Sequence, residues 1–220
     1  MDIERNFDAT IMWQLLVFIV AVLGQIFANV EQAFTENEIV PDSIDIPPNK
    51  FMEIIYPDDA AIELGNFLAP TQTLKVPLVK FNGEPNKYYL LVMTDPDCPS
   101  RAQPTLREMV HWLVGNIPAD NVFSGETLVE YLPAAPPENS GIRRYIFLIY
   151  EQPGQIEFDE PRITNNSLSG RLNFSIRNFA NKYGFGEPIF GNFFNCQYDP
   201  ASPTIHSMFG ISNVPKADHA

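Results

Sequence analysis

The stretch that most constrains the fold is Tyr88–Arg101, with the sequence YYLLVMTDPDCPSR. Its first half is a run of aromatic and branched apolar residues, which predicts a buried strand. The strand ends abruptly at two acids and two prolines. Pro96 and Pro99 fix their own φ angles and restrict the residues before them. We therefore expect a stiff backbone that holds the carboxylates of Asp95 and Asp97 at the tip of the strand.

The rest of the sequence favours short strands over long helices. Twenty of the 220 residues are proline, well above the usual share of about 5 %. Further strands are expected at residues 50–56, 74–81, 107–117 and 145–151 and within 184–197, with a short helix in 171–183. Pro77 places the 74–81 strand at a sheet edge. Pro200, Pro203 and Gly210 argue against a regular helix near the C-terminus.

The N-terminal region contains an apolar segment, Ile11–Leu23. Its length suits the core of a signal peptide and is short for a membrane span. With Ala28 as the cleavage position, we expect residues 1–28 to be a cleaved signal peptide and residues 29–220 to form one secreted domain. A signal peptide usually begins with basic residues, whereas this chain begins with acidic ones. The alternative is an uncleaved anchor that extends to Val30.

Charge and composition argue against several classes of function. The net charge of −13 argues against a nucleic-acid partner. Three histidines and two cysteines, without metal-type spacing, predict neither a metal nor a cofactor. The chain also has no nucleophile elbow and no phosphate loop, which argues against an enzyme. Cys98 and Cys196 are either paired or free, and their spacing does not decide between the two.

Alternation along the 107–117 strand predicts that Met109, His111 and Leu113 share one face. A buried histidine is most often a core residue satisfied by a hydrogen bond. The position of His111, one strand after the Asp95 corner, is what makes a functional role plausible.

Two arginines enter the next apolar strand together. Alternation places Arg143 and Tyr145 on one face and Arg144 on the other. Burying an unpaired charge is costly, so both arginines are expected to have acidic or anionic partners.

Several motifs, in this order, resemble the phosphatidylethanolamine-binding protein family. They are IELGNFLAPTQTLKVP at 62–77, DPDCPSR at 95–101, GIRRYIFLIYEQ at 141–152 and FANKYGFGEPIFGNFF at 179–194. The resemblance covers roughly residues 50–200. It implies a mostly β fold in which a large central sheet packs on a smaller sheet, with a few short peripheral helices. It also implies a small anion pocket at the sheet edge for a phosphate or a phospholipid head group.

Carried onto this sequence, the resemblance implies ligand-binding roles for Asp95, His111, Arg143, Tyr145 and His206. Arg143 stands where the family usually has a second pocket histidine, and His206 lies near the place of a tyrosine. Arginine stays charged and presents a planar fork that suits phosphate. Arg143 therefore either donates to a bound anion or pairs with Asp95 and blocks the pocket.

The expected function is that of a secreted, non-enzymatic binding protein for a phosphate or phospholipid head group. The alternative is a protein-interaction module that inhibits a kinase or a protease, with a protein partner. Asp97 and Arg144 are expected to form a structural brace. Asn165 and Asn173 each begin an N-x-S sequon, which makes them glycosylation sites if the chain is exported.

Overall fold

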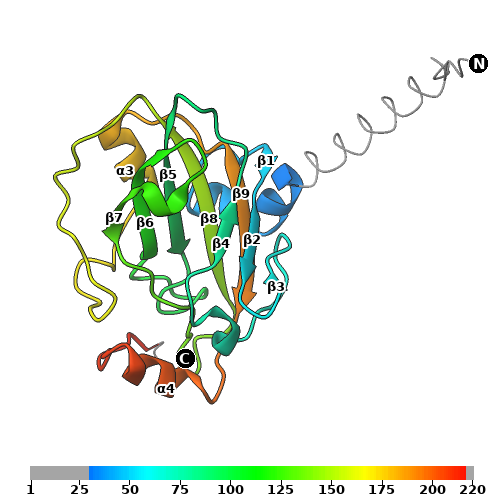
Figure 1. Cartoon of the computed structure of the whole chain (residues 1–220). Coiled ribbons are helices and arrows are strands. Elements are labelled where there is room, and N and C mark those ends of the chain that lie inside the picture. The colour runs from blue at the N-terminus through cyan, green and yellow to red at the C-terminus, as the bar shows by residue number, and fades with distance from the viewer. Residues whose placement is uncertain (1–29, 217–220) are drawn as a thin grey trace, which may run out of the picture.

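The computed structural model describes residues 30–216 and places the apolar run at residues 88–95 in a central strand, β5 (Tyr88–Asp95) (Figure 1). This strand pairs antiparallel with β6 (Met109–Pro118) on one side and with β8 (Arg143–Gln152) on the other. Every residue of β5 after Tyr88 is buried. A strand with both faces covered needs apolar residues at successive positions, which explains the continuous run in the sequence.

The three long strands form the middle of a six-stranded sheet, in the order β1-β9-β8-β5-β6-β7. Its other members are β1 (Lys50–Phe51), β9 (Phe190–Cys196) and β7 (Glu126–Val129). A smaller sheet has the order β3-β2-β4 and consists of β3 (Ala60–Ala61), β2 (Glu53–Tyr56) and β4 (Leu78–Lys80). The expected mostly β fold with a large and a small sheet is confirmed.

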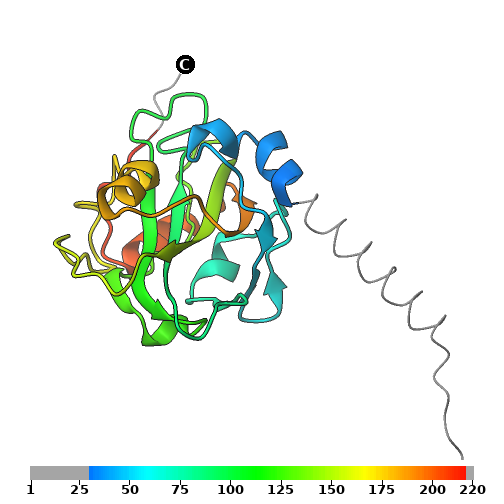
Figure 2. The ribbon, with the colours of Figure 1, turned by 90° about the horizontal axis from the view of Figure 1, so that it is seen from above.

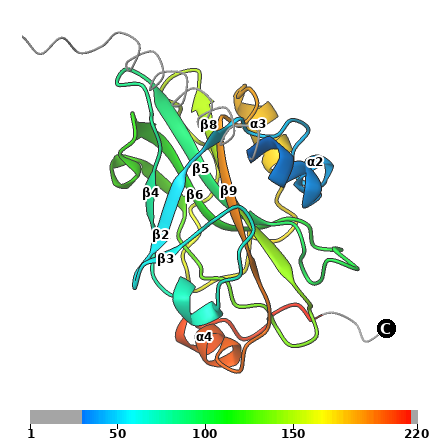
Figure 3. The same cartoon turned by 90° about the vertical axis from the view of Figure 1, so that its right-hand side faces the viewer.

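The large sheet has an apolar layer on each face. On one face it packs against the small sheet, with side chains such as Ile54, Met93 and Phe147 between the two. The other face is covered by helical residues 30–36 and by α2 (Ile39–Asp42) and α3 (Ile176–Tyr183), as Figures 2 and 3 show.

The C-terminal region corrects one prediction, because α4 (Ser202–Met208) is a regular helix (Figure 1). Pro203 lies in its first turn, where the missing N–H has no helical partner to lose. Gly210, with a φ of 67°, lies just beyond its end, in a conformation that glycine adopts without strain. Pro203 and Gly210, which argue against a helix in the sequence, therefore lie at the two ends of α4.

Other expected elements are present with different bounds. The 50–56 strand is two strands, since β1 joins the large sheet while β2 joins the small one. In the 74–81 segment only β4 is a strand, and it does lie at a sheet edge. The expected 171–183 helix begins only at Ile176, where the Ser175 side chain accepts a hydrogen bond from the Asn178 N–H.

Two short 3-10 helices, η1 (Pro70–Thr73) and η2 (Val122–Ser124), complete the described elements. Within residues 30–216 no helix is both long enough and apolar enough to cross a membrane.

Candidate functional site

The tip of β5 buries two carboxylates. Asp95 and Asp97 are both fully inaccessible to solvent. The Asp97 N–H donates to Asp95 Oδ1 at 2.8 Å, so the turn after the strand fixes the orientation of the Asp95 carboxylate. Its second oxygen, Oδ2, is directed toward two side chains from the neighbouring strands, Arg143 and His111.

His111 occupies a β-bulge in β6. Met93 pairs with Trp112 while the next residue, Thr94, pairs with Val110, which leaves His111 as an extra residue between the two pairs. Such a bulge re-aims a side chain relative to strict alternation. Met109 and His111 face the same cavity, but Leu113 packs in the apolar layer on the opposite face of the sheet. The prediction that all three share a face is therefore wrong for Leu113.

Arg143 and Tyr145 come from the start of β8, on the same face of the sheet as predicted. Arg143 forms an ion pair with Asp95 through Nη2 and Oδ2, and both side chains are almost completely buried. The Tyr145 ring contacts the His111 ring edge-on, with 5.1 Å between centroids. His111 Nε2 lies 4.0 Å from Asp95 Oδ2. Asp95, His111, Arg143 and Tyr145 thus converge at one end of the sheet.

These side chains line a cavity that we call the sheet-end cavity, between β6, β8 and α4. Its polar wall consists of His111, Arg143, Tyr145 and His206, with Asp95 behind Arg143. Its apolar wall includes Leu132, Leu168, Ile205, Phe209 and Ile211. The free volume is about 30 Å³, room for about two water molecules.

The C-terminal segment closes this cavity. His206 of α4 contacts the carbonyl oxygen of Ala135 through Nε2 at 2.7 Å. Ile211 packs with Cys98, Met109 and Leu132. Five of the predicted ligand-binding residues therefore lie at or next to one small cavity, with His206 contributed by the lid.

Burial controls the protonation of this site. It raises the pKa of Asp95 to about 6, although the Arg143 cation opposes the shift. It also lowers the pKa of His111 to about 3, with the hydrogen bond to Leu132 opposing. Desolvation raises the pKa of Tyr145 well above its ordinary value. Near neutral pH the site therefore contains an ionised Asp95, a neutral His111 and a neutral Tyr145.

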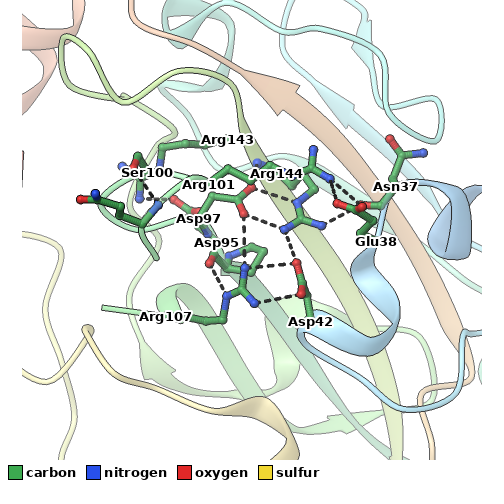
Figure 4. Close-up of polar contacts among 12 residues, drawn as sticks. Asn37, Glu38, Asp42, Asp95, Asp97, Ser100, Arg101, Arg107, Arg143 and Arg144 are labelled. Carbon is green, nitrogen blue, oxygen red and sulfur yellow. Dashed lines mark hydrogen bonds and ion pairs between the residues drawn. The ribbon is translucent and has the colours of Figure 1, made fainter. Parts of the chain in front are cut away.

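The opposite face of β8 carries a separate ionic cluster, which we call the arginine brace (Asp42, Asp97, Arg107 and Arg144; Figure 4). Arg144 donates to Asp97 through Nε at 2.9 Å and through Nη2 at 2.6 Å. Its Nη2 also donates to Asp42 at 2.7 Å. Arg107 donates to Asp42 at 3.1 Å and to the Pro96 carbonyl at 2.7 Å. The brace ties the turn after β5 to α2 and to the start of β8.

Comparison with known proteins decides the family. Residues 58–194 match the family model described as phosphatidylethanolamine-binding protein. The chain belongs to the phosphatidylethanolamine-binding protein family.

Individual relatives agree with this assignment. The chain is 34 % identical over 185 residues to a Drosophila melanogaster protein named putative odorant-binding protein A5, covering 84 % of this chain and 88 % of that protein. The solution structure of a protein designated CG7054 is 40 % identical, has a TM-score of 0.64, and is matched over 80 % of this chain and 98 % of that one. A carboxypeptidase Y inhibitor, solved in complex with its cognate proteinase, is 23 % identical with a TM-score of 0.68. That match covers 78 % of this chain and 96 % of the inhibitor and shows the shared fold.

This member of the phosphatidylethanolamine-binding protein family buries three arginines almost completely, and they differ in their partners. Arg144 uses Nε and both terminal nitrogens for hydrogen bonds. In Arg143, by contrast, Nε and Nη2 have no hydrogen-bond partner among the described residues, although Nη2 contacts Asp95 as an ion pair. His111 Nε2 is also without a partner there. Buried polar atoms are nearly always hydrogen-bonded, so these atoms are suited to bind a ligand or water.

The third arginine, Arg171, was not singled out from the sequence as a structural centre. Its guanidinium donates to five carbonyl oxygens, those of Ser167, Val110, His111, Glu130 and Thr164. Burial lowers its pKa to about 10, with Glu130 opposing. Arg171 thereby fixes the backbone of the His111 bulge. The sequence predicts only that Arg171 lies at the start of a short helix in 171–183, and it does not predict these contacts.

The predicted modification sites and the cysteines differ in their exposure. Asn165 and Asn173 are both exposed. Cys98 and Cys196 are buried and free. Cys98 lines the sheet-end cavity, and burial raises its pKa.

Proposed function

We propose that this chain is a secreted binding protein whose sheet-end cavity takes a phosphate group, free or within a phospholipid head group. The observation that carries the proposal is the Arg143 guanidinium, which is buried, charged and incompletely hydrogen-bonded at the cavity wall. A phosphate oxygen supplies the acceptor that this guanidinium lacks, through a charge-assisted hydrogen bond. The ligand is bound and released without turnover.

The ion pair between Arg143 and Asp95 fits this role as well as the rival one. Asp95 neutralises Arg143 in the empty site, so the guanidinium can stay buried without a ligand. The remaining N–H groups of Arg143 stay available for an anion. In the rival arrangement the Arg143–Asp95 ion pair fills the cavity and blocks it, and Arg143 donates no hydrogen bond to an anion.

Calorimetric titration with inorganic phosphate at one salt concentration separates these cases. A hydrogen bond to a charged group contributes about 1.5–3 kcal/mol, so Arg143→Ala should weaken binding by about tenfold to a hundredfold. Arg101→Ala is the matched control, because it removes an exposed arginine from the loop after β5. Tighter binding by Arg143→Ala would identify Arg143 as a plug. The absence of phosphate binding by the wild type would refute the proposal.

Export is the second part of the proposal. The apolar segment Ile11–Leu23 lies outside the described residues, and its role as a signal peptide rests on the sequence together with the similarity to a protein named as odorant-binding. Secreted material should begin near Asn29, which N-terminal sequencing measures. Asn165 and Asn173 are exposed, so an endoglycosidase should shift the secreted protein on a gel. Cell-retained protein that still carries Met1 would contradict export.

Inhibition of a protease or kinase is the less supported alternative. The similarity to a carboxypeptidase Y inhibitor extends to the fold at 23 % identity. No described residue has been matched to an inhibitory contact, whereas the sheet-end cavity has unpartnered atoms of its own.

A further inference from the structure

The hydrogen bonding of His111 determines which of its two ring nitrogens carries the proton. Nδ1 lies 2.9 Å from the carbonyl oxygen of Leu132. A carbonyl oxygen only accepts hydrogen bonds, so Nδ1 must be the donor. Burial keeps the ring neutral, with a pKa of about 3. Nε2 therefore carries a lone pair and offers an acceptor, not a donor, to the sheet-end cavity.

That lone pair faces other acceptors. Asp95 Oδ2 lies 4.0 Å from His111 Nε2, and neither atom has an aligned hydrogen bond to a described residue. The span of 4.0 Å allows one donor oxygen to lie about 2.8 Å from both atoms. On the other side of Asp95, Arg143 Nε has no acceptor among the described residues, and Nη2 contacts Asp95 Oδ2 as an ion pair without an aligned hydrogen bond. The site is thus complementary to a group that both donates and accepts within a few ångströms.

We propose that the sheet-end cavity recognises the protonated form of a phosphate, inorganic or monoester, by accepting its P–OH hydrogen at His111 Nε2 while Arg143 donates to another oxygen. The proposal rests on the phosphate-binding function above and narrows its ligand. The single P–OH of a phosphodiester has lost its proton near neutral pH, and sulfate has no proton there either. Either would direct an oxygen lone pair at His111 Nε2 and leave that buried acceptor unpaired, which costs binding free energy.

The cavity restricts the ligand to a small group. Its free volume of about 30 Å³ is room for about two water molecules. The apolar side chains of Leu168, Phe209 and Ile211 offer no hydrogen bond to the remaining oxygens. Recognition therefore depends on the few polar atoms at the sheet end, where the presence of one proton on the ligand decides whether His111 Nε2 accepts a hydrogen bond.

A pair of inorganic anions tests this on the wild-type protein. Around pH 8 inorganic phosphate is mainly a dianion that keeps one proton, whereas sulfate is a dianion of similar shape without one. Competition calorimetry should show phosphate binding at least about tenfold more tightly than sulfate. Methyl phosphate keeps its P–OH proton only below its second pKa of about 6, so at about pH 5.5 it should bind, and dimethyl phosphate should bind no better than sulfate.

His111→Phe provides the variant arm, because phenylalanine keeps an aromatic ring against Tyr145 and removes the Nε2 acceptor. Its preference for phosphate over sulfate should fall to nearly one. The wild-type comparison remains decisive even if this variant does not fold. Equal wild-type binding of phosphate and sulfate would overturn the inference and leave the phosphate-binding function intact. Failure of the wild type to bind phosphate, methyl phosphate or sulfate would overturn both.

Vesicle sedimentation separates the two sources of a phosphate monoester. Phosphatidic acid presents the same monoester on a lipid, and phosphatidylcholine presents a diester in the same setting. Sedimentation with phosphatidic acid vesicles alone assigns a lipid source, and binding of methyl phosphate without sedimentation assigns a soluble one. Both results support the proposal, whereas equal sedimentation with both lipids would contradict it.

Discussion

Arg143 and Arg144 are neighbours in the sequence, yet they lie in opposite environments on the two faces of β8. Arg144 is surrounded by Asp97, Asp42 and the Asn37 carbonyl, and Nε and both terminal nitrogens donate aligned hydrogen bonds. Arg143 has one carboxylate partner, and two of its nitrogens lack an aligned acceptor among the described residues. Both side chains are at most 4 % exposed. Burial alone therefore does not separate Arg144 from Arg143, the arginine that we propose binds a ligand, whereas the completeness of hydrogen bonding does.

The difference between the two arginines predicts that the arginine brace contributes more to the free energy of unfolding than the Arg143–Asp95 ion pair. Arg144→Met leaves Asp97 buried and unpaired and also removes the contacts to Asp42 and Asn37. Breaking a buried ion pair by removing one partner costs about 3–5 kcal/mol, so the free energy of unfolding should fall by about that much. Arg143→Met should cost less, because burial raises the pKa of Asp95 to about 6 and Asp95 can take up a proton once its partner is removed. Urea unfolding at neutral pH measures both, and a larger loss for Arg143→Met would reverse the comparison.

The second prediction concerns the pH dependence that Asp95 imposes on stability. Its pKa is about 6 in the folded chain, above the ordinary 3.8 of an aspartate, so the folded state holds the proton more tightly. The corresponding stabilisation is fully present below about pH 4 and is lost as the pH rises through 6. From about pH 4 to pH 7 the wild type should lose up to about 3 kcal/mol relative to Asp95→Asn. Parallel stability profiles for the two proteins across this range would refute the assignment.

The third prediction has the smallest expected effect on stability. Replacing both members of a buried ion pair by apolar residues is often nearly neutral. Asp95→Leu combined with Arg143→Met should therefore change the free energy of unfolding by only about 1 kcal/mol while abolishing phosphate binding. Asp97→Leu with Arg144→Met should be more costly, since Asp42 loses its contact with Arg144 and Arg107 loses its contact with Asp97. Urea unfolding of both double variants measures this. Equal losses in the free energy of unfolding would show that the ion pairs on the two faces of β8 contribute equally to stability.

The sequence predicted the main elements and the residues that the structure brings together at the sheet-end cavity. The run at 88–95 predicted the central strand, and two-residue alternation separated Arg143 from Arg144 correctly. It failed where local irregularity decides the outcome. The bulge at His111 moved Leu113 to the other face, and neither His111 nor its neighbours Val110 and Trp112 is a residue type that signals a bulge.

Two further features depend on contacts between distant segments. Arg171 binds carbonyl oxygens from three regions of the chain, a role that no local pattern encodes. Closure of the cavity by α4 depends on the contact between His206 and Ala135, 71 residues apart. Pro203 was taken as a helix breaker, although at the first turn it is compatible with a helix.

The central claim is that Arg143, unlike Arg144, keeps hydrogen-bonding capacity for a ligand. A crystal structure of the protein grown with saturating phosphate tests it most directly. We predict a phosphate in the sheet-end cavity, with an oxygen about 2.7–3.0 Å from a guanidinium nitrogen of Arg143 and the Arg144 contacts unchanged. A cavity that contains only water, with the Arg143–Asp95 pair undisturbed at saturating phosphate, would contradict the account.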